Sequence, residues 1–172
     1  DLSGAKSCVI EVHTLSKCAR FTNLRLGFTV IPNELKGFKS NYTRLLSSSF
    51  NGVGYPLARA GESVFSKNGK KEVLKNISEV KEKSACLIKK IKEVTPVCGG
   101  ESSPYVYAKC PNGYTSIEFF KRLLYFAGVL GVPSSGFNYG GAGGEYIRFS
   151  AFAEKSDVIS GAERIVKTYL SL

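Results

Sequence analysis

Apolar residues recur with a β-type pattern in the first part of the chain. Two short runs rich in β-branched residues, at 8–12 and 24–31, are predicted strands. Pro32 and Asn33 end the second run. Helices are expected at 41–49 and 56–65, separated by the turn-like sequence NGVG at 51–54. Two strands alone cannot close a core, so this part is expected to need further elements.

The clearest helix is predicted at 70–94. Its apolar residues recur at intervals of three and four, apart from one weak turn at Ser84. The helix is expected to end at Thr95, because the following Pro96 disfavours helical backbone at the residue before it. The apolar positions are Val73, Leu74, Ile77, Val80, Leu87, Ile88 and Ile91.

Strands and helices are expected to alternate in the remainder of the chain. Strands are predicted at 105–109, 129–132 and 146–152. Thr115 and Glu118 have the spacing of a capping box, which predicts a helix from there to Ala127. A last helix is predicted from Ser156. Its apolar face comprises Val158, Ala162, Ile165, Val166 and Tyr169. This order predicts a small α/β layer.

Composition agrees with a globular domain and narrows the partners. The 172 residues are 43% hydrophobic, and the 11 Phe and 9 Tyr are ample for a core. No apolar run approaches the roughly 20 residues that cross a bilayer, so no membrane partner is expected. The net charge of +10 favours binding to anionic partners, such as nucleic acids. No nucleic-acid motif accompanies it, so a solvated helix face is favoured for the lysines at 70, 71, 75, 81, 83, 89, 90 and 92.

Cysteine and histidine usage argues against a disulfide framework and a metal centre. The five cysteines are odd in number and contain no C-x-x-C. A reducing compartment, the cytoplasm or an organellar matrix, is therefore expected rather than secretion, and the N-terminus does not resemble a signal peptide. His13 is the single histidine, which leaves little material for zinc or for a histidine-dependent hydrolase.

The segment 14–27 has the most specific pattern. Lys17 follows an apolar run, hydroxyl residues flank it at Thr14 and Ser16, and Arg25 follows eight residues later. With FTNLRLG at 21–27 and TVIP at 29–32, it resembles the cofactor-lysine segment of fold type I, pyridoxal-phosphate-dependent aminotransferases. The resemblance is greatest to the LL-diaminopimelate aminotransferase branch. It implies an α/β fold with the end of a large domain at 1–67 and a small domain at 68–172.

The resemblance assigns roles in this segment. Lys17 would form the imine with the aldehyde of pyridoxal 5'-phosphate and later act as the base for the proton shift. Thr14, Ser16 and Arg25 would bind the cofactor, with the arginine fork on the phosphate. Burial and a nearby cation are expected to favour the neutral amine. Asn23 stands where most relatives have glycine, and Asn tolerates positive φ. A solvated lysine and a surface arginine are the alternatives.

Arg148 and Asn51 are the substrate-binding candidates. Strand alternation puts Ile147, Phe149 and Ala151 on one face and Arg148 on the other. An arginine on an edge strand is the plain alternative. The stretches PSSGF at 133–137 and GGAGG at 140–144 match the family's approach to this strand. The resemblance therefore implies that Arg148 binds the substrate α-carboxylate. The glycine-rich loop matches no nucleotide-binding motif. By the resemblance, Asn51 corresponds to an asparagine that reaches the neighbouring subunit's substrate site. A role as a plain turn residue is equally expected.

The resemblance predicts an aminotransferase that moves an amino group between an amino acid, such as LL-diaminopimelate or glutamate, and a 2-oxo acid. It implies a homodimer. The absence of Met, even at position 1, and the lack of the family's N-terminal pocket residues predict a C-terminal portion, inactive by itself, whose partner is the N-terminal half of the same polypeptide. A processed N-terminus remains open. So do a basic, non-enzymatic binding module and another pyridoxal-phosphate enzyme, such as a decarboxylase, acyltransferase or lyase.

Overall fold

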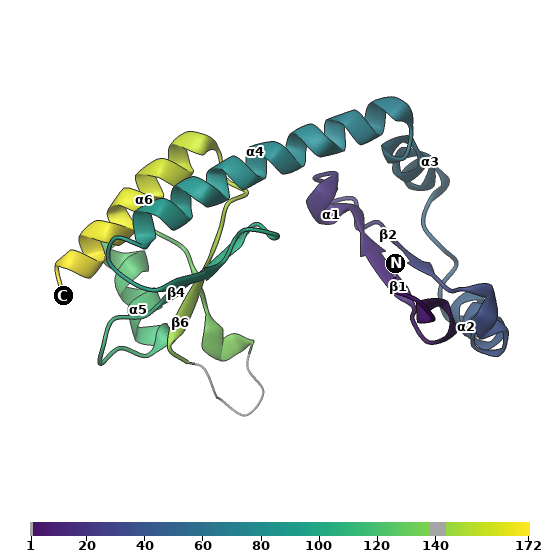
Figure 1. The fold of residues 1–172 in the computed structure, drawn as a ribbon, viewed down its shortest axis with the longest axis horizontal. Coiled ribbons are helices and arrows are strands. Elements are labelled where there is room, and N and C mark those ends of the chain that lie inside the picture. The colour runs from purple at the N-terminus through teal and green to yellow at the C-terminus, as the bar shows by residue number, and fades with distance from the viewer. Residues whose placement is uncertain (1, 138–143) are drawn as a thin grey trace. The chain divides into compact units, whose positions relative to one another are not determined.

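A computed structural model describes residues 2–137 and 144–172, which divide into two units, Asp1–Ile77 and Ser78–Leu172 (Figure 1). The first unit contains a two-stranded antiparallel sheet and short helices, and the second contains a four-stranded sheet. The 25-residue helix α4 (Lys67–Ile91) contributes residues to both units. In the part of the chain that the model describes, no helix is both long and apolar enough to cross a membrane.

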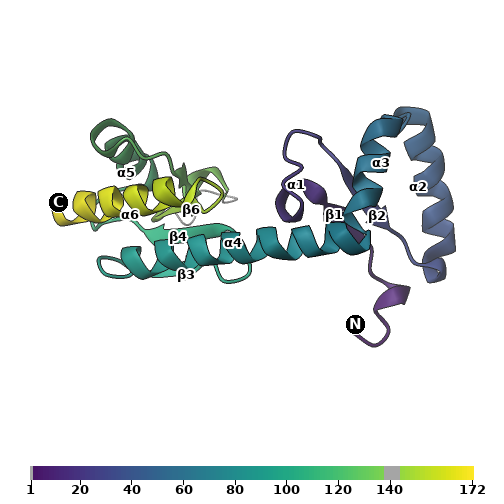
Figure 2. The same cartoon turned by 90° about the horizontal axis from the view of Figure 1, so that it is seen from above.

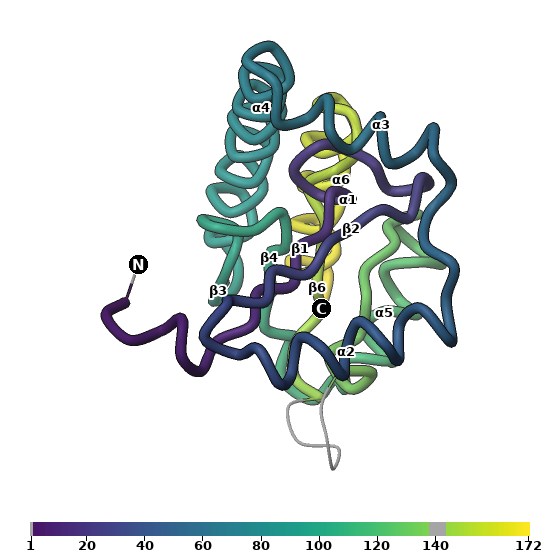
Figure 3. Tube along the Cα trace, turned by 90° about the vertical axis from the view of Figure 1, so that its right-hand side faces the viewer, coloured from purple at the N-terminus to yellow at the C-terminus, as the bar shows by residue number. Residues whose placement is uncertain are grey.

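The first unit is organised around the pair of strands β1 (Glu11–Thr14) and β2 (Gly27–Val30), which run side by side in Figure 3. Thr14 pairs with Gly27, and a Cβ added at Gly27 would lie 2.5 Å from the His13 carbonyl oxygen. Only glycine permits that approach of the two backbones. The other elements are the 3₁₀ turns Ala5–Ser7 and Asn33–Leu35 and the helices α1 (Leu15–Cys18), α2 (Lys36–Ser49) and α3 (Tyr55–Val64).

The core of the first unit is small. Its buried hydrophobic residues are Leu15, Leu26 and Val64. Gly61 of α3 faces Leu26 so closely that a Cβ there would come within 2.6 Å of the leucine side chain, which lets the helix pack on the segment between β1 and β2. Helix α2 has no buried residue. The expectation that two strands would not close a core by themselves agrees with this limited burial.

The sheet of the second unit has the order β3-β4-β6-β5, and all of its pairs are antiparallel. Its strands are β3 (Val97–Gly99), β4 (Tyr105–Lys109), β5 (Val132–Pro133) and β6 (Tyr146–Ser150). The helical elements are α5 (Ser116–Arg122), which continues as a π-helical turn (Leu123–Ala127), the 3₁₀ turn Ser134–Gly136 and α6 (Lys155–Leu170). Helix α6 and the C-terminal part of α4 lie over the same face of this sheet (Figures 1 and 2).

One face of the four-stranded sheet forms the main core. Alternate residues of β4 and β6 point to it and pack with side chains of α4, α5 and α6. The predicted alternation on β6 is confirmed, because Ile147, Phe149 and Ala151 are buried. The largest side chains of the core with no more than 3% exposure are Leu87, Ile91, Phe119, Leu123, Ile147, Phe149 and Ile165.

Several predicted elements differ in extent from the observed ones. The strand at 105–109 is confirmed at both ends. Helices α2 and α4 begin earlier than predicted, at Lys36 and Lys67, and α4 ends at Ile91 rather than at residue 94. The strand expected at 8–12 begins only at Glu11. In place of the strand expected at 129–132, the structure has the two-residue strand Val132–Pro133, whose proline lacks the N–H that would continue the ladder. Strand β3 was not predicted, because three residues give no periodic signal.

The polar residues of α4 also correct the sequence reading. Lys83 is not solvated: it is 8% exposed, and its Nζ donates a 2.8 Å hydrogen bond to the Ala153 carbonyl. Ser84, the weak turn of the pattern, is 1% exposed. Conversely, Leu74 is 67% exposed. The helix therefore buries two polar residues, Lys83 and Ser84, where it packs in the second unit. It leaves Leu74, a predicted core residue, exposed to solvent.

The capping box of α5 is confirmed and gives a prediction for acid conditions. Glu118 accepts hydrogen bonds from the Thr115 N–H (2.9 Å) and hydroxyl (2.8 Å), and these lower the pKa of its carboxyl from 4.5. A lowered folded-state pKa adds stability that is present above pH 4.5 and lost as pH falls through the folded value. The start of α5 is therefore expected to lose hydrogen-exchange protection below about pH 4.5. Glu118→Gln should remove this acid step, and an unchanged step would contradict the assignment.

Candidate functional site

The candidate lysine lies in a single helical turn that begins where β1 ends. Thr14 has extended backbone (φ −124°, ψ 137°), and its Oγ1 accepts the Ser16 N–H at 3.2 Å. The same hydroxyl donates to Ser16 Oγ at 3.0 Å. This N-cap starts the one-turn helix α1, which contains Lys17. Two candidate residues, Thr14 and Ser16, are thus in direct contact, three residues and one residue before Lys17.

Backbone hydrogen bonds bring the segment just before β2 back to the start of α1. Leu15 N–H donates to the Leu26 carbonyl at 3.0 Å, and Phe21 N–H donates to the Leu15 carbonyl at 3.2 Å. Leu15 and Leu26 are buried, so this closure is part of the core of the first unit. Arg25 precedes Leu26 and is therefore held beside the start of α1.

The backbone around Arg25 differs from the expectation. The residues with positive φ in this segment are Arg20 (58°) and Arg25 (52°), and Asn23 is not among them. The idea that Asn23 preserves a left-handed turn is wrong for this structure. Arg25 Nη1 donates to the Thr22 carbonyl at 3.0 Å, which helps to hold the unusual conformation.

The segment is positively charged and largely accessible. Residues 14–27 include Lys17, Arg20 and Arg25 and no Asp or Glu. Lys17 and Arg25 are exposed, and Ser16 is 7% exposed. The burial expected around Lys17 is not supplied by the described residues. Hydroxyl donors, a guanidinium group and a net positive charge within one short segment match the chemistry of a phosphate group.

Asn51 lies in the connection between α2 and α3, at residues 51–54, where the chain has no regular secondary structure. It is exposed, and the next residue, Gly52, has a φ of 85°. The left-handed backbone typical of a turn therefore lies at Gly52 and not at Asn51. The ligand role of Asn51 stays a prediction.

Arg148 lies on β6, which is an interior strand. It pairs with Tyr107 of β4 on one side and with Val132 of β5 on the other. The alternative of an edge-strand arginine is therefore wrong. The side chain is half-buried, and its Cζ lies 4.4 Å from the Tyr105 ring centroid and 4.3 Å from the Phe137 ring centroid. No carboxylate within residues 2–137 and 144–172 forms an ion pair with it.

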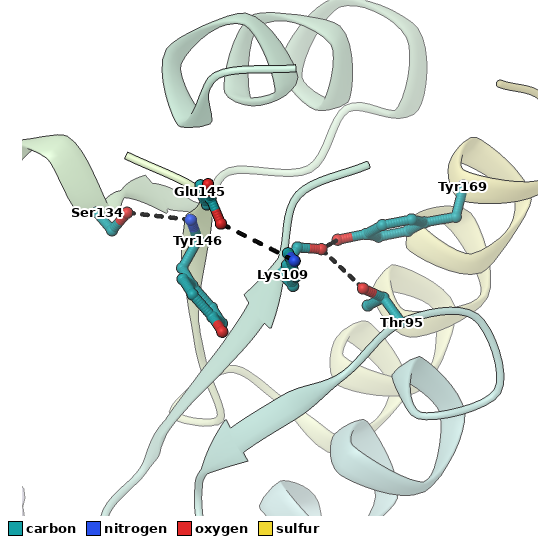
Figure 4. A network of polar contacts seen from close by, with 6 residues as sticks. All are labelled: Thr95, Lys109, Ser134, Glu145, Tyr146 and Tyr169. Atoms are coloured by element: carbon teal, nitrogen blue, oxygen red, sulfur yellow. Dashed lines mark hydrogen bonds and ion pairs between the residues drawn. The ribbon is translucent and has the colours of Figure 1, made fainter. Parts of the chain in front are cut away.

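A polar network holds the end of β4 and the start of β6, two residues from Arg148 (Figure 4). The Tyr169 hydroxyl (2.6 Å) and Thr95 Oγ1 (2.8 Å) both donate to the Lys109 carbonyl. Burial is the largest cause that raises the pKa of Tyr169 well above its ordinary value, so this hydroxyl keeps its proton. On β6, the Tyr146 N–H donates to Ser134 Oγ at 3.1 Å.

The glycine-rich loop is only partly described. Gly140, Gly141, Ala142 and Gly143 lie outside the described residues. The carbonyl of Gly144 accepts the Ser116 N–H at 2.6 Å, which connects the start of α5 to the start of β6. Ser116 and Ser134 were not singled out by the sequence, although both are buried and polar. Isolated serines give no signal of a tertiary contact.

Cysteines and metal ligands form no visible centre in the described ranges. The five cysteines are free thiols. Burial, followed by the charge of Glu145, raises the pKa of Cys110 to about 11, so this thiol is unreactive at neutral pH. No group of three or more His, Cys, Asp or Glu within the described residues has the arrangement of a metal site.

Comparison with known proteins identifies related chains over nearly the whole length. The family model described as aminotransferase class I and II matches residues 1–165. The LL-diaminopimelate aminotransferase of Lachnospira eligens is 39% identical over 170 residues, which are 96% of this chain and 42% of that protein. The protein of the same name from Prochlorococcus marinus subsp. pastoris is 39% identical over 176 residues, which are 96% and 43% of the two chains.

Solved structures agree with these matches. The L,L-diaminopimelate aminotransferase from Chlamydomonas reinhardtii superimposes with a TM-score of 0.87 at 30% identity, over 98% of this chain and 42% of that one. A probable N-succinyldiaminopimelate aminotransferase from Thermus thermophilus gives a TM-score of 0.83 at 25% identity, over 97% and 44%. The chain therefore spans less than half the length of these relatives.

Proposed function

The chain belongs to the class I and II aminotransferases, and on that premise we propose that it supplies the cofactor lysine and the carboxylate-binding arginine of a pyridoxal 5'-phosphate-dependent aminotransferase. The observation that supports this best is local. Lys17 lies in the turn that Thr14 caps, and the Leu15–Leu26 hydrogen bond holds Arg25 beside that turn. A lysine, two hydroxyls and an arginine are the groups that an aldehyde with a phosphate tail requires.

Each residue has a separate role in the proposed reaction. The cofactor, when bound, supplies an aldehyde and an electron-withdrawing ring. Thr14 and Ser16 would hold the phosphate through their hydroxyls, with Thr14 turning toward it the proton that it donates to Ser16 Oγ in the free chain, and Arg25 would neutralise its charge. Lys17 Nζ would act as general base and then as general acid. It would take a proton from the substrate α-carbon and return it two atoms away, in the 1,3-proton shift of transamination. Arg148 binds the substrate carboxylate through two parallel N–H donors.

The proposed substrates are an amino acid such as LL-diaminopimelate or glutamate and a 2-oxo acid, as the names of the related proteins suggest. Such a reaction would belong to lysine biosynthesis. We propose Asn51 as a contact to the substrate site of a second subunit in a homodimer. The free cysteines favour a reducing compartment, in the cytoplasm or an organelle.

We further propose that residues 1–67 belong to a large cofactor-binding domain and residues 68–172 to a small domain. These 172 residues span about 42% of the length of their relatives. The activity is therefore assigned to a protein of the relatives' length that contains them. The isolated chain is expected to catalyse no measurable transamination, because one segment cannot enclose and desolvate a cofactor.

A substrate panel tests this proposal. A protein of the relatives' length that contains these residues is expected to exchange amino groups between LL-diaminopimelate or glutamate and a 2-oxo acid. The same protein with Lys17→Arg is expected to be inactive and serves as the control. Release of carbon dioxide, or acyl transfer, without amino exchange would instead indicate another enzyme of the same cofactor class. Robust glutamate-dependent transamination by the 172 residues alone would contradict the assignment to the longer protein.

A further inference from the structure

Two aromatic rings contact the guanidinium group of Arg148, and they come from opposite sides of its strand. Tyr105 lies on β4, and Phe137 directly follows the 3₁₀ turn after β5. In the sheet, β4 and β5 are the two neighbours of β6. The Cζ of Arg148 is 4.4 Å from one ring centroid and 4.3 Å from the other, well within the range of a cation–π contact.

The Tyr105 ring and the backbone that carries the Phe137 ring, which is 49% exposed, are held by further contacts. Tyr105 pairs in register with Ser150, and its ring meets the edge of the Phe152 ring at a centroid distance of 6.3 Å. The Phe137 N–H donates to the Ser134 carbonyl at 2.9 Å. Ser134 is buried and also accepts the Tyr146 N–H through its hydroxyl. The turn that carries Phe137 is therefore connected to the start of the strand that carries Arg148.

This arrangement restricts how Arg148 can bind a ligand. The guanidinium group is planar, and its N–H donors point outward in that plane. Because its Cζ lies over the faces of two rings, the guanidinium group has its accessible N–H donors on the edge that neither ring covers. No described carboxylate pairs with these donors. A group with two coplanar acceptor oxygens, which is a carboxylate, matches the remaining edge.

We propose that Tyr105 and Phe137 are positioning residues, which hold the Arg148 guanidinium in one orientation and present its edge to a substrate carboxylate. Arginine has many rotamers, and ordering it before binding removes part of the entropic cost of binding. The inference rests on the proposed function, in which Arg148 binds that carboxylate. It adds two residues that do not touch the substrate to the determinants of its affinity.

The test uses ¹⁵N-labelled chain and glutarate as the carboxylate probe, followed by NMR of the arginine Nε–Hε signals. The Arg148 signal, assigned by its loss in Arg148→Lys, is expected to be shifted upfield by ring currents and to move on addition of glutarate. Two cation–π contacts are each equivalent to a few-fold change in affinity, so Tyr105→Leu with Phe137→Leu is expected to raise the glutarate Kd by about tenfold. The upfield shift should disappear in this double variant.

Conservative and distant variants separate the outcomes. Tyr105→Phe and Phe137→Tyr retain the rings and are expected to keep both the shift and the affinity. Tyr125→Leu removes an exposed aromatic residue of the same unit, 77% exposed, and should change neither. An unshifted Arg148 signal in the unaltered chain, or full affinity in the double variant, would overturn the positioning role. If Arg148→Lys leaves glutarate binding unchanged by calorimetry, which does not depend on the lost signal, the carboxylate role of Arg148 in the proposed function fails instead.

Discussion

Borohydride reduction of the chain with limiting pyridoxal 5'-phosphate is expected to label Lys17 before other lysines, and Lys17→Arg is expected to abolish that label. The amine condenses with the aldehyde and releases water, and reduction makes the bond permanent. Arginine keeps the positive charge but does not lose its proton to become a nucleophile. Peptide mass spectrometry locates the added pyridoxyl group.

The phosphate should supply the selectivity for Lys17. A charge-assisted hydrogen bond is worth about 1.5–3 kcal/mol, and the equivalent of one such bond, kept by Thr14, Ser16 and Arg25 together on this exposed segment, favours Lys17 by about tenfold. Pyridoxal, which lacks the phosphate, should label exposed lysines without this preference, and Arg25→Gln should reduce the preference with the phosphate present.

Lys36→Arg provides the matched control, because Lys36 is an exposed lysine of the same unit. It should leave the labelling of Lys17 unchanged. Equal labelling of Lys17 and Lys36 by the phosphorylated reagent would contradict a cofactor site at residues 14–25. This outcome would return the basic binding module to consideration.

The parts of the structure that the sequence predicted depend on short-range rules. The alternation at 146–152 identified the buried face of β6, because successive side chains of a strand point to opposite faces. The capping box at Thr115 and Glu118 identified the start of α5, because its hydrogen bonds join residues three apart. The Thr14–Lys17 turn also depends on a short-range contact, since its cap uses a hydroxyl two residues away, but this turn was not predicted from the sequence.

The parts that escaped prediction depend on pairing between distant segments. Nothing near Arg148 in the sequence indicates that β6 lies inside the sheet, because its neighbours are β4 and the two-residue β5. The contact of Arg148 with Tyr105 follows from that pairing. Lys83 was assigned to solvent by its residue type, yet a carbonyl 70 residues further along the chain accepts its hydrogen bond.

Backbone conformation was the other source of error. Glycine is the usual signal of positive φ, and the substitution of Asn for glycine drew attention to residue 23. The positive φ occurs at Arg20 and Arg25, and arginine is not a residue type that predicts a positive φ. Non-glycine residues in this region carry strain, which persists when surrounding contacts over-determine the conformation. Here the Leu15–Leu26 hydrogen bond and the burial of both leucines supply those contacts.

The largest expected effect on stability is that of Phe119→Ala in the second unit. Phe119 is 0% exposed, and its ring packs against Tyr169 at a centroid distance of 4.8 Å and against Tyr114 at 6.4 Å. Truncation of a buried phenylalanine removes transfer free energy and leaves a cavity, which together cost about 3–5 kcal/mol. A domain has only about 5–15 kcal/mol of stability, so much of the unit's stability should be lost.

Phe126→Ala is the matched control, because it removes the same side chain from a position that is 78% exposed. Its one described ring contact is with Arg122, at 5.2 Å, which is worth about 1 kcal/mol or less. Urea unfolding monitored by hydrogen exchange should therefore show a large loss of protection in peptides of Ser78–Leu172 for Phe119→Ala and a small one for Phe126→Ala. Equal losses would mean that the buried face of β4 and β6 is not the main source of stability. Arg148 projects from the other face of β6. Its aromatic contacts therefore require the core to hold β6 in place.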